Sequence, residues 1–122
     1  MKLHLVLLSH DPERVYPALM FALTAAAMGD EVHLYCTMSG LDLVHPERRR
    51  RIQLEGMPPA DQIFQDALKQ GVHVCACAPS RQMLEQMGIT EEVLESGVKL
   101  EDVSGFLLNL KPVTADTLLT FI

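Results

Sequence analysis

The sequence has no tryptophan, only three cysteines and no apolar run long enough to cross a membrane. Three cysteines in 122 residues do not form the paired pattern of a small secreted scaffold, so we expect a protein of the reducing cytoplasm. The longest apolar stretch, residues 18–28, is interrupted by Thr24 and falls short of the ~20 residues that span a bilayer. The apolar start of the chain runs into His10 and Asp11 instead of a small-residue cleavage site, which favours a β-strand over a signal peptide.

Basic residues are also few. The chain has 10 lysines and arginines against 16 acidic residues, which gives a formal charge of −6. This balance argues against nucleic-acid binding, because a basic surface supplies most of the affinity for nucleic acid. Four of the basic residues form one run, from Arg48 to Arg51. Charge runs are usually solvated loops, and the alternative here is a docking patch for an acidic partner or a neighbouring subunit.

Several catalytic signatures are missing from the chain. No glycine-rich phosphate loop follows the first apolar run, where residues 9–13 place acids instead, so nucleotide binding is not expected. Neither a Gly-x-Ser-x-Gly elbow nor a thioredoxin-like Cys-x-x-Cys occurs. Cys75 and Cys77 lack the second pair of ligands that a structural zinc site requires. We therefore expect no metal and no cofactor.

The chain does contain an alternation of strands and helices. Apolar and β-branched runs predict strands at residues 2–8, 31–37, 72–76, 96–99 and 118–122. Helices are expected at residues 12–28, 60–69, 79–87 and 101–109, with a further turn near residue 90. Pro17 fits the first helix only if it lies in the first turn. This order predicts one α/β domain over residues 1–122, with a doubly wound, mostly parallel five-stranded sheet and helices on both faces.

Ligands of such sheets bind beyond the carboxyl ends of the strands. Three predicted loops lie at that edge, at residues 9–12, 38–43 and 77–80. The stretch 41–58 is predicted as one long loop with room for one helical turn, and loops beyond ~12–15 residues in a compact domain are usually functional or disordered. This edge of the sheet is therefore where we expect chemistry.

Cys77 is the strongest candidate for a reactive group. It stands where the strand at 72–76 runs into a helix that Pro79 starts, since proline suits the first helical position. Ser80 and Arg81 would fall in the first turn of that helix. The unpaired N–H groups and the positive end of a helix favour an ionised, nucleophilic thiolate. The sequence therefore predicts a reactive thiol at Cys77.

The other cysteines and the histidines are weaker candidates. Cys75 shares a strand face with Cys77, but side chains two apart on a strand stand ~6–7 Å from each other, too far for a disulfide without breaking the strand. Cys75 and Cys36 are expected in the core, where free cysteine is common. His10 follows the first strand at the same edge and is a candidate proton shuttle, the alternative being an incidental loop histidine. A structural role is expected for the remaining histidines, His4, His33, His45 and His73.

Four segments carry a resemblance to a known family: residues 15–32, 37–41, 77–89 and 115–121. They look like that family's first helix running into its second strand, the loop after that strand, the segment of cysteine, helix and glycine, and the terminal edge strand. In this order and spacing the chain resembles the DsrE/DsrF-like sulfur-trafficking proteins, which include the TusD-type subunits. The resemblance implies a flavodoxin-like three-layer fold of the DsrEFH type.

The resemblance also implies a function. Cys77 would act as a sulfur carrier or sulfurtransferase, holding a persulfide and passing it to a partner thiol. The implied donors and acceptors are TusA-like or rhodanese-like proteins, and the implied assembly is a homo-oligomer, a trimer or hexamer, or a heteromeric ring. The 48 % apolar content and seven methionines suit surface buried between subunits. Substrate or partner binding is expected at the same edge of the sheet, at His10, Ser39, Gly40, Pro79, Ser80 and Arg81.

Two alternatives remain open at this point. One is a non-enzymatic homo-oligomer that binds a small ligand or a partner at this edge, with Cys77 merely packed. The other is a thiol redox sensor that joins Cys75 and Cys77 on oxidation.

Overall fold

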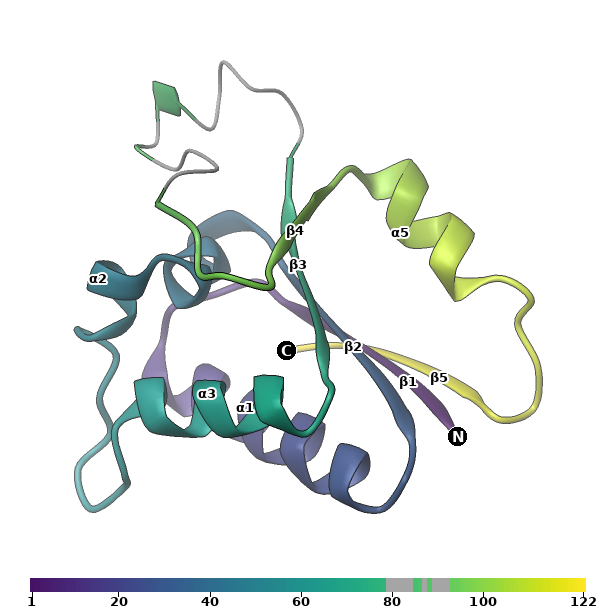
Figure 1. Ribbon diagram of the computed structural model, residues 1–122, viewed down its shortest axis with the longest axis horizontal. Coiled ribbons are helices and arrows are strands. Elements are labelled where there is room, and N and C mark those ends of the chain that lie inside the picture. The colour runs from purple at the N-terminus through teal and green to yellow at the C-terminus, as the bar shows by residue number, and fades with distance from the viewer. Residues whose placement is uncertain (79–84, 87, 89–92) are drawn as a thin grey trace.

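The computed structural model describes residues 1–78, 85–86, 88 and 93–122. Within this part of the chain five strands form one sheet in the order β4-β3-β2-β1-β5. The strands are β1 (Lys2–Leu7), β2 (Glu31–Cys36), β3 (His73–Cys77), β4 (Lys99–Glu101) and β5 (Thr117–Phe121). Every adjacent pair is parallel, and helices cover both faces (Figure 1). The predicted three-layer α/β fold is therefore confirmed, with a sheet that is parallel throughout.

The two faces of the sheet are covered unequally. Helices α1 (Pro12–Ala27) and α3 (Ala60–Lys69) pack side by side on one face, and α5 (Val103–Leu110) lies on the other (Figure 1). Between β2 and α3 the chain forms a 3-10 helix, η1 (Met38–Val44), and one turn of helix, α2 (Pro46–Arg49). These two elements order much of the stretch that the sequence predicts as a long loop.

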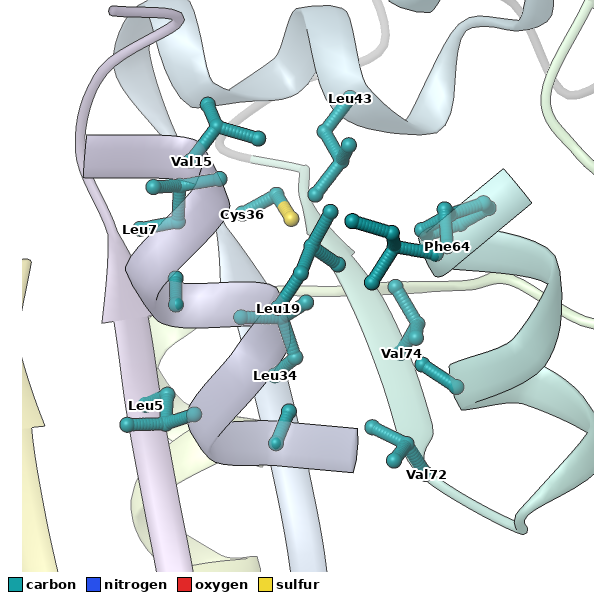
Figure 2. Close-up of a cluster of buried hydrophobic side chains, with 14 of the residues drawn as sticks. Leu5, Leu7, Val15, Leu19, Leu34, Cys36, Leu43, Phe64, Val72 and Val74 are labelled. Carbon is teal, nitrogen blue, oxygen red and sulfur yellow. The ribbon is translucent and has the colours of Figure 1, made fainter. Parts of the chain in front are cut away.

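The main core lies between the sheet and the α1–α3 layer. Figure 2 shows side chains of this core from the sheet, among them Leu5, Leu34 and Val74, on the side where Leu19 of α1 and Phe64 of α3 lie. Alternate residues of β1, β2 and β3 point to this face, as the pleat requires, and the apolar residues of α3 recur at helical spacing on its inner side. A smaller cluster on the opposite face lies under α5, and it consists of Val6, Tyr35, Cys75, Cys77 and Phe106. We call it the α5-side cluster.

Pro17 lies inside α1, beyond its first turn, so the expectation that it belongs to the first turn is wrong. A proline there removes one helical N–H donor. Its neighbours Tyr16 and Ala18 are buried against the core, and the Tyr16 hydroxyl donates to the carbonyl oxygen of Pro58 at 2.7 Å. These contacts keep α1 continuous past Pro17 despite the missing backbone hydrogen bond.

The arginine run does not behave as one solvated segment. Arg50 and Arg51 are exposed, whereas Arg49 is 1 % exposed. The Arg49 guanidinium bonds to Asp61 at 2.7 Å and to Glu95 at 2.9 Å. The expectation of a solvated loop is thus wrong for Arg49, because three elements converge on its side chain.

The predicted helix at residues 79–87 lies largely outside the described residues, as does the predicted turn near residue 90. The strand predicted at residues 96–99 overlaps β4 only at Lys99, and the helix predicted from residue 101 begins instead at Val103, because Glu101 belongs to β4. The other predicted strands and helices form within a few residues of the expected bounds. The described helices include none with both the length and the apolar character needed to span a membrane.

Candidate functional site

Cys77 is the last residue of β3, at the carboxyl end of the sheet. It pairs in register with Glu101 of β4, whose carbonyl oxygen accepts the N–H of Ala78 at 3.1 Å. The Cys77 side chain is 7 % exposed, so its sulfur is covered by neighbouring groups. Cys77 therefore lies at the edge of the sheet where the sequence predicts it, but its thiol is buried.

The neighbours of Cys77 belong to the α5-side cluster. The hydroxyl of Tyr35, in β2, donates to the carbonyl oxygen of Glu101 at 3.1 Å, and the Tyr35 side chain belongs to the same buried cluster as Cys77. Burial raises the pKa of Tyr35, and the interaction with Cys77 adds to this effect. The ring of Phe106, from α5, lies 4.8 Å from the ring of Tyr35 between centroids. The Cys77 thiol is therefore packed in one cluster with the uncharged hydroxyl of Tyr35 and the ring of Phe106.

Tyr35 is a residue of the site that the sequence did not predict. Strand alternation places its side chain on the same face as His33, and the order of the strands then brings that face against Cys75 and Cys77. The alternation was readable from the sequence. The register between β2 and β3 was not, because pairing depends on tertiary structure.

Three predicted site residues, Pro79, Ser80 and Arg81, lie outside the described residues. So does the helix start that was expected to favour the thiolate of Cys77. Their proposed roles stay predictions.

His10 and Ser39 lie together where β1 and β2 end. The backbone N–H of His10 donates to the Ser39 hydroxyl at 3.1 Å, and His10 Nδ1 lies 2.8 Å from the Asp42 carboxylate. The other carboxylate oxygen of Asp42 is 3.7 Å from the Arg48 guanidinium. Asp42, which the sequence analysis did not single out, therefore joins these two loops.

Gly40 sits in η1 against the end of β1. A Cβ atom added at Gly40 would lie 2.4 Å from the carbonyl oxygen of Leu7. The backbone N–H of Gly40 donates to Thr37 at 2.9 Å, and the N–H of Thr37 donates to the same Leu7 oxygen at 3.0 Å. The absence of a side chain at Gly40 thus allows η1 to pack closely against the end of β1.

Within the described part of the chain, no hydrogen bond or ion pair connects Cys77 with His10 or Ser39. The edge of the sheet therefore carries two separate groups. One is the Cys77–Tyr35 pair at β3 and β2, and the other is the His10–Ser39–Asp42 group at β1 and β2.

The remaining cysteines are buried, as expected of core residues. All three cysteines are free thiols. Burial raises the pKa of Cys36, and burial together with the Glu101 carboxylate raises the pKa of Cys75 to about 12. Both thiols therefore stay protonated at neutral pH, which disfavours them as nucleophiles.

Three of the histidines form a stack across the sheet on the α5 face. The ring centroids of His4 and His33 are 4.5 Å apart, and those of His33 and His73 are 4.8 Å apart. A cavity of about 370 Å³ is lined by His33 and His73 together with other residues, among them Cys75, Lys99 and Glu101. Among the described residues, no three histidine, cysteine or acidic side chains are arranged to hold a metal ion.

Comparison with known proteins gives consistent results. A model of the DsrE/DsrF-like family matches residues 1–122. The chain is 32 % identical over 98 residues to an uncharacterized protein of Methanopyrus kandleri, an alignment that covers 78 % of this chain and 75 % of that protein. It is 29 % identical over 112 residues to an uncharacterized protein of Methanocaldococcus jannaschii, covering 92 % of this chain and 90 % of that protein.

Proposed function

Because the chain belongs to the DsrE/DsrF-like family over its full length, and because β3 ends on Cys77, we propose that it is a sulfur carrier or sulfurtransferase. Cys77 holds a persulfide and passes its outer sulfur to a partner thiol. The single observation that carries this proposal is the position of Cys77 at the carboxyl end of a central strand, where parallel sheets bind their ligands.

The chemistry requires two thiol exchanges. In the first, the Cys77 thiolate attacks the outer sulfur of a donor persulfide, the donor S–S bond breaks, and the donor leaves as a thiolate. In the second, an acceptor thiolate attacks the outer sulfur of the Cys77 persulfide and releases the Cys77 thiolate. The sulfur moves between equivalent bonds, so no external oxidant, reductant, metal or cofactor is consumed.

The burial of Cys77 sets a condition on this transfer. Its sulfur lies in the α5-side cluster, beside the rings of Tyr35 and Phe106. A donor therefore has to displace part of this cover before the sulfurs meet. α5 buries only Phe106 and Leu110, so it is held to the sheet by few side chains and is the element we expect to yield.

We assign partner binding to the edge that surrounds Cys77. Docking there would use His10, Ser39, Gly40, Pro79, Ser80 and Arg81. TusA-like or rhodanese-like proteins would supply and receive the sulfur, in the reducing cytoplasm where thiols stay free. A homo-oligomer, a trimer or hexamer, is supported by exposed apolar side chains on α1, at its C-cap and on β5, namely Met20, Phe21, Met28, Leu118 and Phe121.

Mass spectrometry of the intact protein after incubation with a low-molecular-weight persulfide tests the proposal. We expect a gain of one sulfur atom, reversible by a thiol reductant, in the wild type and in Cys75→Ser. Cys77→Ser is expected to lose this gain. Equal loading of Cys77→Ser would overturn the proposal.

A second candidate function is favoured by the burial of Cys77 itself. A packed thiol is also what a non-enzymatic binding module would show, with the partner seated at the same edge. Alkylation at neutral pH separates the two functions, since a carrier thiol reacts quickly once its cover moves and a packed thiol reacts only as fast as the protein unfolds.

A further inference from the structure

The Tyr35 hydroxyl lies near Cys77, at the end of β4. It donates to the carbonyl oxygen of Glu101 at 3.1 Å, and this residue is paired in register with Cys77. The Tyr35 and Cys77 side chains belong to the same buried cluster. The Tyr35 side chain is 4 % exposed and its ring packs on Phe106. Packing thus fixes the direction in which the hydroxyl points.

This hydroxyl can serve either protonation state of the sulfur. A tyrosine hydroxyl has one proton to donate and lone pairs that accept. When Cys77 is a thiol, the hydroxyl donates to Glu101 and accepts from the S–H group. When Cys77 is a thiolate, the same proton turns to the sulfur, and the Glu101 carbonyl keeps the N–H of Ala78 at 3.1 Å. No buried group loses its last partner in the exchange.

The residues packed near Tyr35 and Cys77 favour such a donor. Glu101 and Asp102, at the end of β4 and the start of α5, are both acidic and act on Tyr35. Cys75 on β3 stays protonated, and Lys99 acts on Cys75 from the far end of β4. Because Glu101 is paired in register with Cys77, an anion at Cys77 would lie near a carboxylate and would gain from a neutral donor.

We propose that Tyr35 is the hydrogen-bond donor that stabilises the thiolate of Cys77. This assignment deepens the proposed function and rests on it for its use in sulfur transfer. The thiolate is the nucleophile when Cys77 is loaded and the leaving group when the sulfur is passed on, so one donor serves both steps. A charge-assisted hydrogen bond is about twice as strong as a neutral one, which favours the ionised form. Burial keeps the pKa of Tyr35 above its ordinary range, so the hydroxyl retains its proton.

The test is the pH profile of Cys77 alkylation by iodoacetamide, followed at the single residue by peptide mass spectrometry. In Tyr35→Phe we expect the midpoint to move to higher pH and the rate at neutral pH to fall about tenfold, as removal of a hydrogen bond to a charged group implies. Tyr16→Phe is the matched control, since the chain has two tyrosines and the Tyr16 hydroxyl donates instead to Pro58 at 2.7 Å. Its profile should match that of the wild type.

A second measurement tests the role of Tyr35 even if Tyr35→Phe does not fold. In the Tyr16→Phe background Tyr35 is the one remaining tyrosine, so 3-fluorotyrosine supplied during expression replaces it alone. The fluorinated hydroxyl is more acidic and a stronger donor, so the midpoint should move to lower pH. Profiles that coincide in all these proteins would overturn the role of Tyr35.

The outcome is independent of sulfur loading. If the midpoint moves as expected but the wild type takes up no sulfur from a persulfide, the proposed function fails and the assignment of Tyr35 as the thiolate donor stands. If the wild type loads sulfur on Cys77 but the midpoint does not move, the assignment fails and the proposed function stands.

Discussion

His4 is a buried histidine inside the sheet. Its side chain is fully buried, and neither ring nitrogen has a hydrogen-bond partner among the residues that the structure describes. Its ring stacks on His33 and meets the edge of Phe106. Burial, reinforced by the nearby cations His33 and Lys2, lowers the pKa of His4 from 6.5 to about 4. A neutral His4 imidazole can be buried there because it stacks like an aromatic ring. A charged imidazole would have no contact that offsets the cost of its burial.

This histidine makes the stability of the protein depend on pH. The unfolded chain takes up a proton at His4 near pH 6.5, and the folded chain does so only near pH 4. The unfolded state therefore binds more protons between these values, and the free energy of unfolding falls by up to about 3 kcal/mol as pH drops through this window. Urea unfolding at a series of pH values measures this slope.

His4→Phe supplies the control for that measurement. Phenylalanine keeps an aromatic ring against His33 and Phe106 but does not titrate, so the variant should lose most of the slope between pH 6.5 and 4. An unchanged slope would assign the acid sensitivity to other groups, among them Glu31 and His33, which face His4 on β2.

At the scale of elements, the segment between β2 and α3 is organised by Arg49. Its guanidinium donates to Asp61 of α3, to Glu95 and to the carbonyl oxygen of Leu43 in η1. It also lies 4.3 Å from the centre of the Phe64 ring. One side chain thus joins the long connection to the helix layer and to residues that precede β4.

Replacing Arg49 should therefore destabilise the protein. Arg49→Met leaves the partly exposed carboxylates of Asp61 and Glu95 without their shared cation and leaves the Leu43 carbonyl oxygen without this donor, which costs about 1–3 kcal/mol for a group left unsatisfied. Because Arg51 is exposed, Arg51→Met should change the free energy of unfolding by only about 0.5 kcal/mol or less. Urea unfolding compares the two, and equal effects would contradict the assignment.

The same elements show what the sequence can and cannot predict. Apolar runs located the strands, and the carboxyl ends of β1, β2 and β3 followed from a parallel sheet. The burial of Arg49 could not be predicted, because its acidic partner Glu95 is distant in the chain and a run of arginines carries no sign of which one turns inward. Tyr35 was missed for a related reason, since its contact with Cys77 depends on the register between two strands.

At the scale of the whole molecule, an apolar groove lies open at the β5 edge of the sheet. This groove of about 760 Å³ runs between α1 and β5 and is lined mainly by apolar side chains, among them Phe21, Met28 and Leu118. β5 is the last strand in the sheet order, so this groove lies at an edge of the fold. An exposed apolar surface of this kind is typical of a protein interface, and the proposed homo-oligomer would cover it.

A charge in this groove should therefore dissociate the oligomer without unfolding the subunit. Phe21 is 65 % exposed, so Phe21→Glu removes little from the core, but it would place an unpaired carboxylate inside the interface. We expect sedimentation velocity to show a larger species for the wild type and a folded monomer for Phe21→Glu. Gln62→Glu adds the same charge on an exposed position of α3 and should keep the wild-type size. A monomeric wild type, or an unchanged oligomer in Phe21→Glu, would show that subunits do not associate through this groove.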